Sequence, residues 1–296
     1  MKRLLFVFNP YAGKTKIKSK LSWILDFFIK QGFNVEVYVT QDTGDTAWEI
    51  SRRAWDMDLV VVSGGDGTMN AAVSGLMQVP AERRPPLGYI PAGTTNDFAK
   101  SLRLPKDIQK AAEVAVTLPP TPTDIGRFED EYFTYVAGFG AFTSVSYLTP
   151  QDSKNMLGHQ AYIFEGLKSL AEIKSHHVKV IFGTEEIEDD FLICLVTNSV
   201  SVAGFKKISG RDVELDDGLF EVVLIRDPKN PLDLTRVVQE LFLDEEPNNF
   251  VQRFKTDSIR FVSEEPIDWV LDGEFGGSRT DVHIGICKSA LDIVRK

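Results

Sequence analysis

The sequence lacks three features that would each define a whole class of protein: abundant cysteine, a long hydrophobic run and an excess of positive charge. It has two cysteines, Cys194 and Cys287, which are too few for a disulfide framework, so we expect a reducing compartment such as the cytoplasm. The apolar run at 3–8 is shorter than a signal-peptide core and far shorter than a membrane span. Because the formal net charge is -10, we do not expect nucleic acid as a partner.

Two common nucleotide-binding motifs are also missing. AGKT at 12–15 would end a P-loop, but the first glycine of that motif would then fall at Phe8. GGDG at 64–67 lacks the G-x-G-x-x-G spacing of a dinucleotide-binding turn. These departures argue against the P-loop and dinucleotide-binding classes.

The first part of the chain alternates between strand-like and helix-like patterns. The run DLVVV at 58–62 is continuous and apolar, as expected of a strand covered on both faces. Strand–helix alternation predicts a parallel sheet with helices on both faces, so we assign an α/β fold to this part. The expected strands cover 3–8, 34–39, 58–62 and 87–90, and the expected helices cover 21–29, 46–55, 68–77 and 108–116.

A proline-rich stretch, TLPPTPTD at 117–124, ends this pattern, and we place a domain boundary there. Beyond it, short runs such as HVKVIF and LFEVVLI are separated by turn residues or acidic loops. This pattern predicts a C-terminal antiparallel β-sandwich domain, interrupted by helices near 154–173 and 232–241. The predicted domains are therefore 1–122 and 123–286, and the tail 287–296 is a candidate to complete the first domain.

Three of the four strands expected in the first domain end in unusual loops. These loops are NPYAGK at 9–14, GGDGT at 64–68 and PAGTTND at 91–97. Ligands of open α/β sheets bind beyond the carboxyl ends of the strands. Glycine lets backbone N–H groups at the start of a helix approach an anion. The three loops together therefore predict a phosphate site.

Two acidic positions allow two interpretations each. The charge of Asp66 would repel a phosphate, which indicates Mg²⁺ between them, but Asp66 is also a good residue to cap the following helix. LDGE at 271–274 is typical of a turn. Phosphoryl transfer to an alcohol, however, needs a group that orients and deprotonates the hydroxyl, and a carboxylate from the second domain would suit that role.

GGDGT, combined with NPYAGK and with PAGTTNDFA at 91–99, resembles the soluble bacterial diacylglycerol kinase family. That family includes the catalytic domains of sphingosine and ceramide kinases. GGDGT alone is shared with NAD kinases and phosphofructokinases, and PAGTTNDFA is the discriminating segment. The resemblance extends to YVAGFGAFTSVS at 135–146, LDDGLFEVVLI at 215–225 and LDGE. It implies that the first domain is Rossmann-like, as in NAD kinase and diacylglycerol kinase.

The resemblance also implies roles for individual residues. The general base would be Asp272 or Glu274, and Asp66 and Asp97 would join a metal and water network near the transferred phosphate. Glu165 stands where some relatives carry a lysine. The residues implied to contact ATP are Asn9, Pro10, Tyr11, Ala12, Gly13, Thr40, Gly64, Gly65, Asp66, Gly67, Thr68, Met69, Asn70 and Thr94. The residues implied to hold a structural Mg²⁺ are Glu214, Asp217 and Leu219, the first and last through backbone carbonyls.

The function expected from these observations is ATP- and Mg²⁺-dependent phosphorylation of a membrane lipid, diacylglycerol, to phosphatidic acid. We expect a cytoplasmic protein with peripheral contact at the inner face of the membrane, and a homodimer is an open prediction. Three alternatives remain at this point. The acceptor could be another lipid alcohol, sphingoid or phosphatidylglycerol-like. It could be a soluble molecule, as in an NAD kinase. The chain could also be a nucleotide-binding regulator without turnover.

Overall fold

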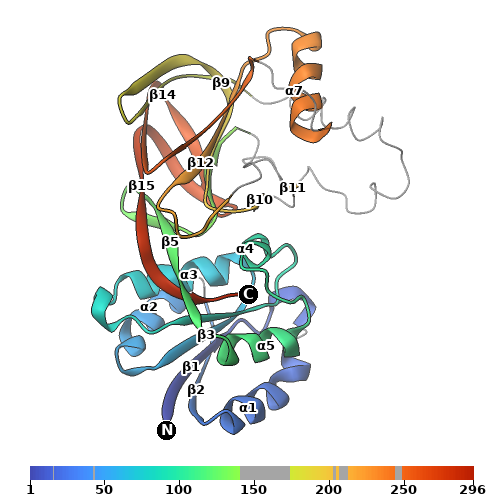
Figure 1. Ribbon diagram of the computed structural model, residues 1–296, viewed down its shortest axis with the longest axis vertical. Coiled ribbons are helices and arrows are strands. Elements are labelled where there is room, and N and C mark those ends of the chain that lie inside the picture. Colours follow the sequence, from blue (N-terminus) through green and yellow to red (C-terminus); the bar gives the residue numbers. More distant parts are fainter. Residues whose placement is uncertain (16, 43, 141–173, 203–204, 207–212, 244–248) are drawn as a thin grey trace.

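The first domain is built on a parallel sheet with the strand order β2-β1-β3-β4. The structure is a computed structural model that describes residues 1–15, 17–42, 44–140, 174–202, 205–206, 213–243 and 249–296. The four strands are β1 (Lys2–Phe8), β2 (Phe33–Val39), β3 (Leu59–Gly64) and β4 (Leu87–Pro91). All residues of β3 and β4 are buried, which accounts for their apolar sequences. The sheet lies in the lower half of Figure 1.

Helices cover both faces of this sheet. Successive strand residues point to opposite sides, and because the residues on both sides are apolar, each side packs against helices. Leu5 and Val7 pack with α2 and α3, whereas Leu4 and Phe6 pack with α1 and α5. The predicted α/β alternation is confirmed. The helices are α1 (Leu21–Lys30), α2 (Asp45–Arg53), α3 (Asp66–Met77), α4 (Asp97–Ser101) and α5 (Ile108–Thr117). Short 3₁₀ helices lie at Ala12–Thr15, Lys18–Lys20, Ala54–Asp56 and Ala81–Arg83.

The start of α3 differs from the prediction. The helix begins at Asp66 rather than near Thr68, and the residue at its N-cap is Gly65, in an extended conformation. Asp66 is therefore inside the first turn and does not cap the helix. A carboxylate in the first turn interacts favourably with the helix dipole, which offsets part of the cost of burying its charge.

The second domain is rich in antiparallel strands. It contains β5 (Pro120–Phe128), β6 (Glu131–Phe133), β7 (Val136–Phe139), β8 (His176–Phe182), β9 (Glu185–Thr197), β12 (Phe220–Arg226), β13 (Val251–Thr256), β14 (Ser258–Leu271) and β15 (Glu274–Val294). The pairings β7–β9, β9–β8, β8–β14 and β14–β7 join four of these strands in a ring. Antiparallel pairing is thus as predicted, and a two-layer sandwich stays a prediction. β10 (Ser201–Val202) pairs separately with β11 (Phe205–Lys206).

Of the two predicted helical inserts, the second is present as α7 (Pro231–Leu243). The first, at 154–173, lies outside the described residues, and so does Glu165. Among the helices that the structure describes, none is long and apolar enough to cross a lipid bilayer.

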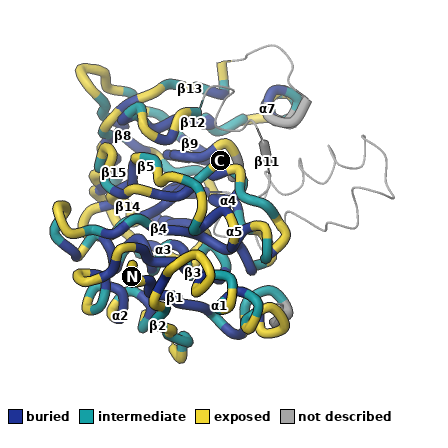
Figure 2. The backbone as a smooth tube through the Cα atoms, turned by 60° about the horizontal axis from the view of Figure 1, so that its bottom comes forward, coloured by how far each residue is buried: buried dark blue, intermediate teal, exposed yellow. Residues whose placement is uncertain are grey.

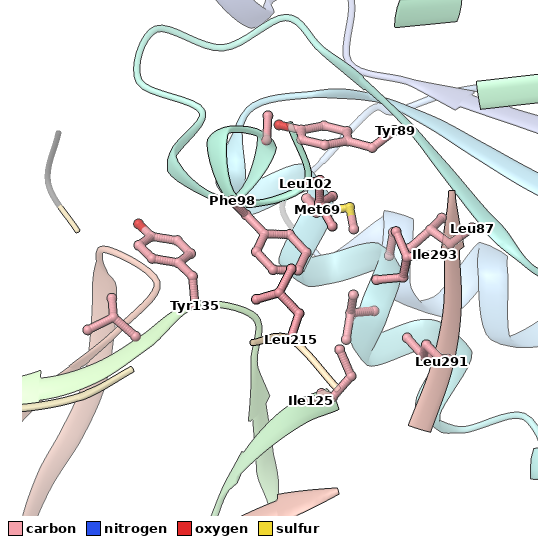
Figure 3. Packing of buried hydrophobic residues seen from close by; sticks show 14 of the residues in the cluster. Met69, Leu87, Tyr89, Phe98, Leu102, Ile125, Tyr135, Leu215, Leu291 and Ile293 are labelled. Atoms are coloured by element: carbon pink, nitrogen blue, oxygen red, sulfur yellow. The ribbon is translucent and has the colours of Figure 1, made fainter. Parts of the chain in front are cut away.

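The end of the chain returns to the first domain. Near its C-terminus β15 pairs in parallel with β4, with Ile293 opposite Leu87, while it also pairs with β5. A continuous apolar core joins the domains at this point, and Figure 3 shows Phe98 of the first domain against Leu215 and Ile125 of the second. The buried segments in Figure 2 likewise run through both domains. The two domains are therefore held to each other by packing as well as by the chain.

Candidate active site

The loops that follow β1, β3 and β4 lie side by side at one edge of the sheet. The carbonyl oxygen of Gly64 accepts hydrogen bonds from the backbone N–H groups of Ala92 and Gly93, at 2.8 and 3.1 Å, and from the Tyr89 hydroxyl at 3.1 Å. Asn9 N–H donates to the Ser63 carbonyl at 2.8 Å. These bonds tie the ends of three strands together, so the loops are held as one unit.

The residues predicted to contact ATP fall on this unit in different ways. The side-chain oxygen of Asn9 closes the turn by accepting the N–H of Tyr11 at 2.8 Å, and Tyr11 is 77% exposed. Thr40 follows β2 and donates its N–H to the Phe8 carbonyl at 3.1 Å. Met69 is fully buried in the core, so its side chain faces away from any ligand at the loops.

Three carboxylates gather next to the glycine loop. Asp66 accepts the N–H of Phe98 at 3.2 Å, which ties it to the start of α4. Burial is the main reason that the pKa of Asp66 is raised to about 6, and the charges of Asp97 and Asp272 raise it further. Asp97 is 1% exposed and pairs with Lys100 at 2.6 Å. The three carboxylates therefore raise one another's cost of ionisation, and Lys100 offsets part of the charge at Asp97.

Asp272 is engaged on both of its carboxylate oxygens. Oδ2 accepts from the Asn70 amide, from the Thr134 N–H and from the Thr134 hydroxyl, at 2.7, 2.6 and 2.7 Å. Oδ1 accepts from the N–H groups of Tyr135 and Val136, at 2.9 and 3.1 Å. Burial raises the pKa of Asp272 while these bonds favour its charged form. Five donors thus hold the Asp272 carboxylate in place.

Glu274 has the opposite environment. Asp272 and Gly273 have φ values of 51° and 91°, as required at the two central residues of a tight hairpin turn, and Leu271 pairs directly with Glu274 across it. The turn interpretation of LDGE is thus correct. The turn also presents Glu274, which is exposed, to the first turn of α3: a Cβ atom on Gly67 would lie 3.9 Å from its Oε1.

The charge on Asp66 predicts a stability effect. Because its pKa rises from 3.8 to about 6 on folding, the folded protein binds more protons than the unfolded chain between these values, and stability falls as pH rises through this window. Replacing Asp66 with Asn removes this loss. We expect Asp66→Asn to stabilise the ligand-free protein at pH 7.5 by about 1–3 kcal/mol, with a smaller gain at pH 4.

Urea unfolding followed at both pH values measures the gain. The control is Asp56→Asn, since the Asp56 side chain is 77% exposed, and a surface change of this kind stays within about 0.5 kcal/mol. An Asp66→Asn protein that is no more stable than the wild type at pH 7.5 contradicts the buried-charge argument.

The loop predicted to hold a structural Mg²⁺ has other partners. Asp217 Oδ1 accepts the N–H of Leu219 at 2.9 Å, and Oδ2 pairs with Lys255 at 3.0 Å. The Asp217 carbonyl accepts from Lys288 Nζ at 3.1 Å. In the described part of the chain, no group of three or more His, Cys, Asp or Glu residues is placed to hold a metal. This arrangement does not fit Mg²⁺ unless the lysines move, so the Glu214, Asp217 and Leu219 site stays a prediction.

Sequence reasoning missed some of the residues that build this site. Thr134 lay within an apparently ordinary strand, YFTYVA, although it supplies two donors to Asp272. Lys100 could have been found, because residues three apart on a helix are neighbours and it follows Asp97 at that spacing. Tyr89, which binds the Gly64 carbonyl, carried no signal beyond that of a core aromatic residue.

Comparison with known proteins agrees with the motifs. A family model described as the diacylglycerol kinase catalytic domain matches residues 3–128. A diacylglycerol kinase of Bacillus subtilis is 34% identical over 280 residues, covering 94% of this chain and 91% of that protein. One from Staphylococcus saprophyticus is 34% identical over 278 residues, covering 93% of this chain and 90% of that protein.

The fold has a counterpart among solved structures. A crystal structure of a diacylglycerol kinase from Bacillus anthracis superposes on this chain with a TM-score of 0.79 and 22% identity. The match covers 100% of this chain and 97% of that one. That likeness establishes the shared two-domain fold. The matched sequences, which extend over nearly the whole chain, establish more: the chain belongs to the diacylglycerol kinase family and is a kinase.

Proposed function

We propose that this protein transfers the γ-phosphoryl group of ATP to the hydroxyl of diacylglycerol, giving ADP and phosphatidic acid. The observation that carries the proposal is the position of Glu274, an exposed carboxylate presented by the second domain beside Gly67 at the start of α3. A base thus lies next to the loop that suits a phosphate. Phosphoryl transfer to an alcohol needs these two parts close together.

ATP would lie across the loops after β1, β3 and β4, with its phosphates at the start of α3. The first N–H groups of a helix have no partner within the helix and favour anions. The switch in strand order between β1 and β3 supports the same place, since ligands of open α/β sheets bind where neighbouring strands connect in opposite directions. The loops are held by the hydrogen bonds to the Gly64 carbonyl, so little rearrangement is needed on binding.

Mg²⁺ would be held by Asp66 and Asp97 together with the phosphates, because Mg²⁺ in kinase sites commonly takes one or two carboxylates and completes its shell with substrate oxygens and water. When bound, it would neutralise charge on the phosphates. Burial raises the pKa of Asp66 to about 6, and a cation bound beside it would favour the charged carboxylate.

In the reaction, Glu274 accepts the proton of the substrate hydroxyl as the oxygen attacks the γ-phosphorus. The bond from that phosphorus to the β,γ-bridging oxygen breaks, and ADP leaves with the electron pair. Asp272 fixes the turn that carries Glu274. Beside Glu274, Phe275 is 70% exposed, so an apolar side chain lies next to the proposed base, and peripheral contact with a membrane stays a prediction. A cytoplasmic location and a homodimer stay predictions.

The proposal is tested by an acceptor panel with γ-³²P-labelled ATP and Mg²⁺. Diacylglycerol in mixed micelles should be labelled at least tenfold faster than sphingosine, ceramide or phosphatidylglycerol, and NAD without detergent should stay unlabelled. Faster labelling of another lipid would replace diacylglycerol as the substrate. Labelling of NAD would favour a soluble-substrate kinase, and tight ATP binding without transfer to any acceptor would favour a regulator.

A further inference from the structure

The side chain of Asn70, in the first domain, forms hydrogen bonds with residues of the second domain. Asn70 lies one turn into α3, directly after the glycine loop, and was expected to face ATP. Its amide nitrogen instead donates to Asp272 Oδ2 at 2.7 Å and to the carbonyl of Tyr132 at 3.0 Å. An amide NH₂ has two hydrogens, and these two bonds use both of them. The donor end of Asn70 is therefore committed to the second domain.

Among the hydrogen-bond donors that the structure describes around Asp272, Asn70 differs from the rest in origin. The others are the backbone N–H groups of Thr134, Tyr135 and Val136 and the hydroxyl of Thr134, which belong to the same domain as Asp272. They fix the turn within the second domain. The bond from Asn70 fixes the turn relative to α3, which carries the glycine loop.

The geometry of α3 gives this bond a consequence for Glu274. Gly67 and Asn70 are three residues apart and lie on the same face of the helix. Asn70 holds Asp272, and Gly67 lies opposite Glu274, where an added Cβ would be 3.9 Å from Oε1. One face of α3 therefore holds the turn through Asp272 and, at Gly67, leaves space beside the Glu274 carboxylate.

We propose that Asn70 is a positioning residue for phosphoryl transfer. Its amide holds the turn at 271–274 against α3, and so sets the distance between the Glu274 carboxylate and phosphates bound at the start of that helix. The proposal rests on the proposed function, in which Glu274 is the base. A misplacement of about 1 Å in such a pair can cost about 100-fold in rate, whereas nucleotide binding depends on the loops and not on this amide.

The test compares Asn70→Ala and Asn70→Asp with the wild type. Asn70→Ala should lower kcat with diacylglycerol about 10- to 100-fold, while the Kd for the ATP analogue AMP-PNP changes less than about threefold. Asn70→Asp places a second carboxylate against Asp272 and should lower kcat further than Asn70→Ala. Hydrogen exchange at 271–276 should be faster in both variants, because the turn has lost its hold on α3.

A loss of stability alone must be separated from a loss of position. Val73→Ala removes buried side-chain volume from the same helix without touching the turn, since Val73 is fully buried in the core. Assayed well below its unfolding temperature, it should keep wild-type kcat and wild-type exchange at 271–276. An equal loss of kcat in Val73→Ala would show that helix stability, rather than the amide, sets the rate.

The outcomes separate this inference from the proposed function. An active wild type with an Asn70→Ala protein of unchanged kcat overturns the inference alone. A Kd for AMP-PNP raised tenfold or more with kcat preserved also overturns it, and would make Asn70 a nucleotide ligand. A wild-type protein that phosphorylates no lipid overturns the proposed function and the inference with it.

Discussion

Glu274→Gln should abolish most phosphoryl transfer while leaving the fold and ATP binding intact. The amide of Gln has nearly the shape of the carboxylate but cannot accept a proton, and general-base catalysis contributes about 10² to 10⁴-fold. The expected loss in kcat is of that size. Because Glu274 is exposed, the unfolding temperature should not change. The measurements are kcat with diacylglycerol, the Kd for AMP-PNP and a thermal unfolding curve.

Two companion variants sharpen this result. Asp272→Asn should also lower kcat, but it should destabilise the protein by several kcal/mol, since an amide cannot accept from all five donors around Asp272 and buried donors left unpaired are costly. Glu131→Gln changes an exposed carboxylate on β6 and should leave kcat and stability unchanged. Wild-type turnover in Glu274→Gln would remove Glu274 from the mechanism.

The first domain was predictable from sequence because its strands follow two clear patterns. β3 and β4 are wholly buried and β1 largely so, and such strands appear as continuous apolar runs. β2 lies at the edge of the sheet and shows an alternating pattern instead. Each of the four is found within a few residues of the expected range. Turn residues and helical periodicity then placed the helices. The carboxyl ends of neighbouring parallel strands share an edge, so the meeting of the three loops followed from the strand assignment.

The second domain was less predictable because two of its strands, β14 and β15, are long and shift register along their length. The short apolar runs SIRFV and DWVL look like two separate strands in the sequence, but both lie in β14, and DVHIGI is a small part of β15. The pairing between β14 and β15 shifts register between Val262 and Ile267. Such shifts interrupt the alternation of apolar and polar residues, so one strand resembles several. β13 has no clear strand pattern in the sequence, because charged residues interrupt the apolar positions of VQRFKT.

The prolines at the expected boundary lie within a strand. Pro120 and Pro122 lie inside β5 and pair with Val294 and Asp292 of β15. Proline is compatible with a strand where its missing N–H would face an open edge, and here β6 pairs with β5 only from Gly126 onward. The prolines therefore mark an edge of the sheet.

Contacts between distant residues were beyond the reach of sequence patterns. Asn70 and Asp272 are separated by 202 residues, and neither GGDGT nor LDGE indicates that the other is near. The prediction that the DGE carboxylates would face the glycine loops came from the resemblance and from the needs of the reaction. Which of the two is free to act depends on the donors around Asp272, which only the three-dimensional arrangement reveals.

Gly13→Ala should weaken ATP binding at least tenfold and destabilise the protein by about 2–4 kcal/mol. Gly13 has a φ of +51°, and a Cβ atom there would lie 1.7 Å from the carbonyl oxygen of Ala92. That oxygen belongs to the backbone and cannot turn away. The loops after β1 and β4 would have to separate, and both belong to the predicted ATP site. Calorimetric titration with AMP-PNP and urea unfolding measure the two effects.

Two further glycines separate the causes. Gly32 has a φ of +89° with nothing within 4 Å of an added Cβ, so Gly32→Ala carries the backbone strain alone and should cost about 1 kcal/mol without changing the Kd. Gly93 has no positive φ, but a Cβ there would lie 2.5 Å from Gly65 Cα, so Gly93→Ala carries the collision alone.

If the meeting of the loops creates the ATP site, Gly93→Ala should weaken AMP-PNP binding as strongly as Gly13→Ala, and Gly32→Ala should bind it like the wild type. Equal effects of Gly13→Ala and Gly32→Ala on the Kd would instead attribute the loss to general destabilisation. Unchanged binding in both Gly13→Ala and Gly93→Ala would place ATP elsewhere, because neither loop could then lie against the phosphates. The three variants therefore test whether ATP binds where the loops at the ends of the strands touch one another.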